Sequence, residues 1–141
     1  MNEGVKRIVL VEPDPELAEI TSFRLELLGY CVHTVGSVED ALKQIAGALP
    51  DLVITDMQLP GLDGIALIER LSSSEETHGL PVIVLSANPD LDRVQTVFEV
   101  GACDYLVIPF HMETLEEKVA KQLSAQQTKK RNAEASSVGT Q

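Results

Sequence analysis

Five short runs of apolar, mostly β-branched residues recur along the chain, separated by stretches with the three- and four-residue spacing of amphipathic helices. Most of these runs are apolar on consecutive residues, which is typical of strands covered on both faces. Such strands alternating with helices predict a parallel sheet between two helical layers, and therefore an α/β fold. The runs are RIVLV from Arg7, CVHTV from Cys31, LVIT from Leu52, PVIVLS from Pro81 and DYLV from Asp104.

The first helix has clear start and stop signals. Asp14 can cap its N-terminus with Pro15 at the first helical position, and Gly29 ends it. Its expected buried stripe consists of Leu17, Ile20, Phe23 and Leu27. Four more helices are predicted to begin near Ser37, Ile65, Leu91 and Met112.

The last helix loses its apolar stripe from about Ser124. We expect its end to fray there and residues 126–141 to form a flexible tail or linker. A chain of 141 residues with 44% apolar content then suits one domain with a real core, at about 5–125.

The charge balance narrows the range of partners. A formal net charge of -11 disfavours direct binding to nucleic acid or to an anionic membrane, because both repel an acidic surface. Proteins and cations are the expected partners. The sequence shows no leader pattern and no apolar run of membrane-spanning length, which predicts a cytoplasmic location.

Acidic residues follow two of the predicted strands. Glu12 comes directly after the first strand and Asp56 directly after the third. In open α/β sheets, ligands bind beyond the carboxyl ends of the strands, where the strand order reverses. Carboxylates a few ångströms apart repel by about 1 to 4 kcal/mol unless a proton or a cation lies between them. A hard divalent ion such as Mg²⁺ is the cation that such oxygen ligands bind best. The alternative is that Asp14 only caps a helix and Glu12 only ends a strand.

The order of these features resembles the receiver domain of bacterial response regulators. The resemblance covers about residues 5–125 and rests on the acid after the first strand, Asp56 followed by Pro60 and Gly64, Ser86-Ala87 after the fourth strand, and the stretch DYLVIPF at the fifth. It implies a flavodoxin-like, doubly wound sheet of five parallel strands in the order 2-1-3-4-5, with five helices in a single domain.

The resemblance also implies roles for individual residues. Asp56 would accept a phosphoryl group from a phosphohistidine of a sensor kinase or phosphotransfer protein, with Mg²⁺ held by Glu12, Asp56 and the backbone carbonyl of Gln58. Ser86 would donate a hydrogen bond to the phosphoryl group, and Tyr105 would turn inward as Ser86 moves. It implies a cis peptide bond between residue 108 and Pro109.

Two positions depart from the family pattern. Pro13 stands where the family usually has a second acidic metal ligand, and Ile108 stands where it has a lysine. We therefore expect weak Mg²⁺ binding and impaired phosphorylation of Asp56. The alternative is a pseudo-receiver that binds partner proteins without phosphate.

Other classes of function fit less well. A flavodoxin-type cofactor binder would need a phosphate-binding loop after the first strand, where Glu12-Pro13-Asp14 would repel phosphate. An aspartate-based phosphatase would usually want a second acid two residues after its nucleophile, and Gln58 occupies that place. The sequence thus favours a signalling module over an enzyme. It leaves open the kinase, the effector protein or domain, and the oligomeric state, a homodimer included.

Overall fold

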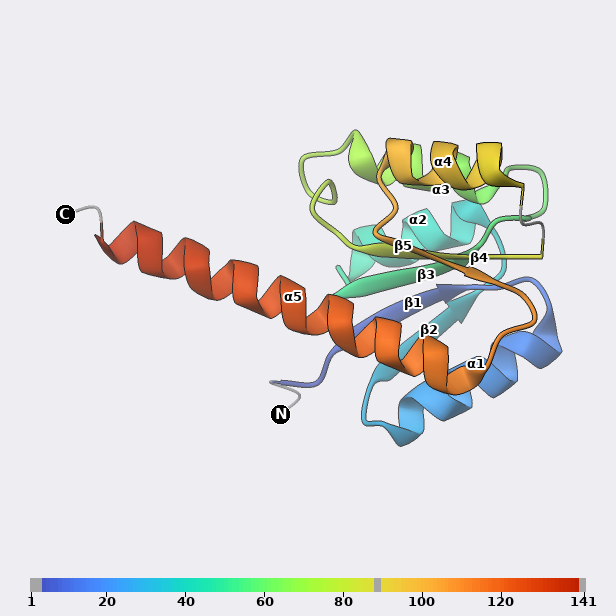
Figure 1. Cartoon of the computed structure of the whole chain (residues 1–141), viewed down its shortest axis with the longest axis horizontal. Coiled ribbons are helices and arrows are strands. Elements are labelled where there is room, and N and C mark those ends of the chain that lie inside the picture. Colours follow the sequence, from blue (N-terminus) through green and yellow to red (C-terminus); the bar gives the residue numbers. More distant parts are fainter. Residues whose placement is uncertain (1–3, 88–89, 140–141) are drawn as a thin grey trace.

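The computed structural model describes residues 4–87 and 90–139, in which five strands alternate with five helices (Figure 1). The strands are β1 (Arg7–Val11), β2 (Cys31–Val35), β3 (Leu52–Asp56), β4 (Val82–Ser86) and β5 (Asp104–Val107). The helices are α1 (Pro15–Leu27), α2 (Val38–Gly47), α3 (Gly64–Ser72), α4 (Leu91–Val100) and α5 (Met112–Gly139).

The strands form one parallel sheet in the order β2-β1-β3-β4-β5, which confirms the expected topology. The register pairs Val11 with Thr55 and Asp56 with Leu85, so the carboxyl ends of β1, β3 and β4 are level. The chain leaves β1 towards β2 on one side and returns to β3 on the other. The strand order therefore reverses between β1 and β3, where a ligand site is expected.

Two hydrophobic clusters cover the two faces of the sheet, because successive side chains of a strand point to opposite faces. Val9 and Val53 belong to the cluster under α2, α3 and α4. Ile8 and Ile54 belong to the cluster under α1 and α5. Figure 1 shows the same two helical layers on either side of the sheet.

Helix α1 begins as predicted but buries a different face. The Asp14 side chain accepts hydrogen bonds from the backbone N–H groups of Glu16 and Leu17. The expected stripe is wrong in its main members, because Ile20, Phe23 and Leu27 are 55%, 59% and 67% exposed. The residues buried instead are Ala18, Thr21 and Leu25. Apolar residues surround most of this helix, so periodicity alone does not identify the face that packs, whereas the small Ala18 and Thr21 allow close approach to the sheet.

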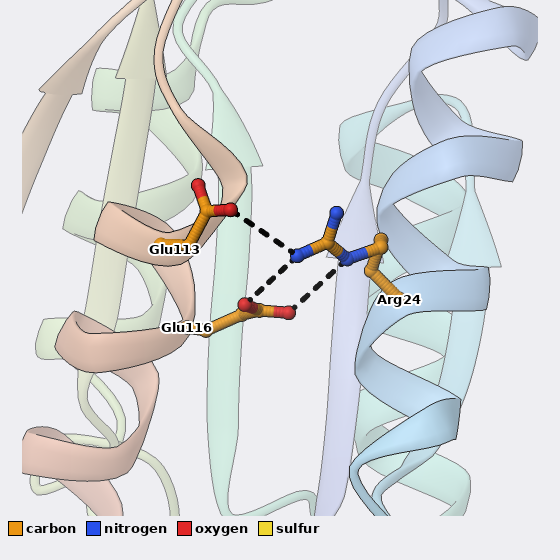
Figure 2. Close-up of polar contacts among 3 residues, drawn as sticks. All are labelled: Arg24, Glu113 and Glu116. Atoms are coloured by element: carbon orange, nitrogen blue, oxygen red, sulfur yellow. Dashed lines mark hydrogen bonds and ion pairs between the residues drawn. The ribbon is translucent and has the colours of Figure 1, made fainter.

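An ion pair joins α1 to α5 on this side of the sheet (Figure 2). The guanidinium of Arg24 binds Glu116 through two nitrogens, with Nη2–Oε1 at 3.1 Å and Nε–Oε2 at 3.3 Å. Glu113 adds a longer contact at 3.9 Å. The Nε and Nη2 atoms of Arg24 thus both point towards α5.

Helix α5 continues to Gly139, well beyond Ser124, where the sequence analysis expected the helix to fray into a flexible tail. The segment after Ser124 is rich in alanine, glutamine, lysine and arginine, which have high helix propensity and sustain helical backbone without an apolar stripe. In Figure 1 this part of α5 projects past the sheet. Within the described part of the chain, no helix combines the length and apolar character needed to cross a bilayer.

Candidate functional site

The predicted acidic residues meet at the carboxyl edge of the sheet, beside the point where the strand order reverses. Glu12 follows β1 and is only 3% exposed, while Asp56 ends β3 and remains partly exposed. Because β1 and β3 are neighbours in register, the two carboxyl groups lie next to each other. The tertiary structure thus brings together residues 44 positions apart in the sequence.

The buried carboxyl group of Glu12 is only half satisfied. Its Oε2 accepts the backbone N–H of Asp14 at 3.1 Å. Its Oε1 is buried and has no hydrogen-bond donor. An orphaned oxygen is costly when buried, so this one needs a proton of its own or a cation.

Burial raises the pKa of Glu12 from 4.5 to about 7. The backbone hydrogen bond from Asp14 opposes this rise, and the charge of Asp56 and a hydrogen bond between the two carboxyl groups add to it. A proton on Glu12 would give its remaining oxygen a hydrogen to donate. A divalent cation would replace this proton.

The loop after β3 fixes one oxygen of Asp56. The backbone N–H of Gln58 donates to Oδ1 of Asp56 at 2.9 Å. Gly64 closes the loop, because its N–H donates to the Met57 carbonyl at 2.7 Å and a Cβ at this position would lie 2.9 Å from the carbonyl oxygen of Asp56. Only glycine allows this close approach. Gly64 is therefore required for the turn after β3.

Ser86 and Tyr105 lie on the two strands beyond Asp56. Ser86 ends β4 and is buried, next in the sheet to the end of β3. Tyr105, on the edge strand β5, is half-buried and packs against the cluster under α2, α3 and α4. Ser86 and Tyr105 thus lie on the two strands next to β3 on the side away from β1.

The two departures from the family pattern have different surroundings. Pro13 is exposed between Glu12 and the cap of α1. The Ile108–Pro109 peptide bond is cis, as predicted, and the N–H of Ile108 donates to the Ser86 carbonyl at 2.8 Å. The Ile108 side chain packs against the cluster under α1 and α5, together with Phe110 and Met112.

The oxygen atoms at this edge fit a magnesium ion that keeps several waters. Glu12 and Asp56 supply two carboxylates, and hard oxygen ligands are what Mg²⁺ prefers. Among the side chains that the structure describes, no three from acidic, histidine or cysteine residues gather as a metal-binding group. With Pro13 in place of an acid, two carboxylates are all that the strand ends offer.

One contact near the site was not predicted from the sequence. Asp63, the N-cap of α3, forms an ion pair with Arg93 on α4, with Nη2–Oδ2 at 3.4 Å. Its other oxygen accepts the Ala66 N–H at 3.1 Å. No pattern in the sequence links Asp63 to a residue 30 positions away.

A separate apolar groove of about 500 Å³ lies at the opposite end of α2 and α3. Its lining includes Leu42, Ile45 and Leu49 of the α2 segment and Leu71 of α3. None of the predicted site residues lines it. The acidic edge, which combines a buried orphan oxygen with a raised pKa, is the better candidate for chemistry.

Comparisons with known proteins identify a family for the chain. The model of the response regulator receiver domain matches residues 8–120. The chain is 36% identical over 113 residues to the DNA-binding dual master transcriptional regulator RpaA of Synechocystis sp., which covers 77% of this chain and 45% of that protein. The chain thus spans about half the length of the curated relatives it matches.

Solved structures show the same architecture. A CheY-like response regulator receiver domain protein from Methanospirillum hungatei superposes with a TM-score of 0.84 at 25% identity, covering 89% of this chain and 99% of that one. The receiver domain of the sensor histidine kinase PA1611 from Pseudomonas aeruginosa gives a TM-score of 0.78 at 26% identity, covering 86% and 99%. That structure has a magnesium ion coordinated in its active-site cleft.

Proposed function

The chain belongs to the response regulator receiver domain family, and we propose that it works in two-component signalling with Asp56 as its phosphoryl acceptor. The observation that carries the proposal is the arrangement at Asp56. Gln58 N–H holds one carboxylate oxygen, the residue is partly exposed at the sheet edge, and a second carboxyl group lies beside it. A nucleophile of this kind needs a fixed orientation and access to its donor.

In the transfer step, a carboxylate oxygen of Asp56 attacks the phosphorus atom of a phosphohistidine. The new O–P bond forms as the P–N bond breaks, and the electron pair of that bond stays on the imidazole nitrogen. Gln58 N–H orients the attacking carboxylate and withdraws charge from the oxygen that it binds. Phosphoryl transfer depends mainly on such positioning and on charge stabilisation.

Glu12, Asp56 and the backbone carbonyl of Gln58 are the groups that would hold Mg²⁺. The ion, when bound, supplies positive charge that offsets the charge of the phosphoryl oxygens. Support comes from the buried, unpaired Oε1 of Glu12 and from the magnesium ion in the related receiver of PA1611. Because Pro13 supplies no carboxylate, binding is expected to be weak.

Ile108 weakens the site further. An ammonium at this position would form a charge-assisted hydrogen bond worth about 1.5 to 3 kcal/mol, or roughly ten- to a hundredfold in an equilibrium. Isoleucine offers none of this, and its side chain packs with the apolar cluster under α1 and α5. Phosphorylation of Asp56 is therefore impaired relative to a receiver with the full set of residues.

Ser86 and Tyr105 form the proposed switch. The hydroxyl of Ser86, buried at the end of β4, is placed to move towards a phosphoryl group on Asp56. Tyr105 would follow it further into the cluster against which the ring already packs. The surface changed by this movement is the signal that an effector reads.

The partners follow from this role. A sensor kinase or phosphotransfer protein delivers the phosphoryl group, and an effector protein or domain responds to it. The relative RpaA is named as DNA-binding, but the chain matches less than half of that protein, and the formal charge of -11 opposes contact between this domain and DNA. Residues 5–125 form the proposed receiver unit, since the last buried side chain described on α5 is Leu123.

A pseudo-receiver that acts without phosphate is the second candidate, and the burial of Ile108 against the core favours it. Intact-mass measurement after incubation with Mg²⁺ and acetyl phosphate distinguishes the two. We expect partial gain of one phosphoryl group in the parent and none in Asp56→Asn. A parent that gains no mass, and that shows no NMR shift on titration with beryllofluoride, would leave the pseudo-receiver as the better account.

A further inference from the structure

Among the residues described at the carboxyl edge of the sheet, there is one arginine and no lysine. The loops at this edge have the sequences EPD, GS, MQLPGLD, ANPD and IPFH, which contain neither residue type. Of the first turns of the five helices, only that of α4 contains an arginine or lysine, and this residue is Arg93. Ile108 supplies no cation, so Arg93 is the candidate cation that the described residues offer at this edge.

Arg93 is also in contact with the loop that holds Asp56. Its guanidinium pairs with Asp63, whose backbone forms a bridge with Gln58. Gln58 in turn donates to the Asp56 carboxylate, and Gly64, the neighbour of Asp63, lies against the Asp56 carbonyl. The ion pair thus lies next in sequence to Gly64, whose position leaves no room for a Cβ beside the Asp56 carbonyl.

We propose that Arg93 supplies the positive charge that Ile108 does not, by leaving Asp63 and binding an oxygen of the phosphoryl group on Asp56. This inference rests on the proposed function. In the unphosphorylated protein, the pair with Asp63 holds Arg93 at the edge of the site. After phosphorylation, Arg93 joins α4 to the phosphoryl group.

The exchange is favourable on physical grounds. The side chains of Arg93 and Asp63 are 43% and 45% exposed, and ion pairs this open to water are weak. A phosphoryl group carries close to two negative charges and three acceptor oxygens, whereas Asp63 carries one charge. Arginine suits this role because its planar fork of donors matches phosphate oxygens. Asp63 keeps its cap on α3 through Ala66 after the guanidinium leaves.

Four variants test the exchange by beryllofluoride titration in the presence of Mg²⁺, followed by NMR. Arg93→Gln removes the cation, and we expect binding about tenfold weaker than in the parent. Asp63→Asn keeps an oxygen that can cap α3 but releases Arg93, so binding should strengthen several-fold. The double variant should bind like Arg93→Gln, because Asp63 acts through Arg93. Arg70→Gln, in the last turn of α3, matches the charge change away from the site and should bind like the parent.

The opposite signs expected for the two single variants separate this role from a structural one. If Arg93→Gln and Asp63→Asn weaken binding equally, the pair only braces α4 against the loop and the inference is wrong. It is also wrong if Arg93→Gln binds like the parent, or if Asp63→Asn still strengthens binding in the Arg93→Gln background. In those cases the proposed function stands, since the parent binds. A parent that binds no beryllofluoride and gains no mass with acetyl phosphate overturns both proposals.

Discussion

Glu12 follows β1 and Asp56 ends β3, so the two carboxyl groups lie side by side at the carboxyl edge of the sheet. One of the two is buried and the other is partly exposed, so their environments differ. Burial therefore raises the pKa of Glu12 to about 7. Several testable consequences come from this pair and its surroundings.

Removal of the charge at Glu12 should stabilise the metal-free protein in a pH-dependent way. The pKa of Glu12 is raised from 4.5 to about 7 in the folded state, so its contribution to stability is fully present below 4.5 and is lost as the pH rises through about 7. Glu12→Gln avoids this loss. Urea unfolding in EDTA should show a gain of up to about 3 kcal/mol at pH 8 and little change at pH 4.5.

A control for this measurement is Glu19→Gln, which alters an exposed carboxylate on α1. It should change the free energy of unfolding by less than about 0.5 kcal/mol at both pH values. Equal effects of Glu12→Gln at pH 4.5 and pH 8 would contradict the raised pKa.

Mg²⁺ should bind more weakly than to a receiver that has an acid at position 13. The reason is one fewer carboxylate ligand, which also lowers the repulsion in the metal-free site. Isothermal calorimetry should show little heat at submillimolar Mg²⁺, and Asp56→Asn should abolish the binding that remains. Submillimolar affinity in the parent would be evidence against the two-carboxylate site.

Restoration of the family residues should raise phosphorylation. Pro13→Asp and Ile108→Lys each supply a charge worth about 1.5 to 3 kcal/mol at the metal or the phosphoryl group. Because the new carboxylate acts through the metal it holds, and the metal and the new ammonium neutralise the same developing charge, a double-mutant cycle of acetyl-phosphate labelling should show coupling. Ile108 packs against the core, so thermal melts must accompany the labelling. A repaired protein that folds well but labels no faster would favour the pseudo-receiver.

The observed orientation of α1 predicts a large loss of stability from a substitution at Leu25 and a small loss from one at Phe23. Leu25 is fully buried, so Leu25→Ala should lower the free energy of unfolding by about 2 to 5 kcal/mol. Phe23 is 59% exposed, so Phe23→Ala should cost less than about 1 kcal/mol. Chemical denaturation of both variants checks the rotation of the helix. A larger effect at Phe23 than at Leu25 would restore the face expected from the sequence.

Truncation after Ala125 tests the extent of the receiver unit. The buried contacts described on α5 end at Leu123, so the shortened chain should keep its sheet and most of its stability. Its melting temperature should fall by no more than a few degrees, whereas truncation before Val119 should unfold it, because Val119 and Leu123 belong to the cluster under α1 and α5. Loss of folding on removal of residues 126–141 would place the boundary further along the chain.

The sequence by itself determined the strands, the helix caps and the edge at which the acids meet. These features depend on local chemistry and on short-range periodicity, as with Asp14 at the start of α1. The strand order came from the family resemblance. Parallel topology then dictates that residues after successive strands share one edge, so the meeting of Glu12 with Asp56 could be predicted without coordinates.

Only the tertiary structure decided which face of α1 is buried, where the Ile108 side chain lies, and that Asp63 meets Arg93. Each depends on how elements distant in the sequence pack against one another. Apolar residues surround most of α1, so its sequence pattern did not identify one buried face. Packing against the sheet and α5 determined which face is buried. The Asp63–Arg93 pair joins two helices whose separation is set by packing, and no local pattern records that distance.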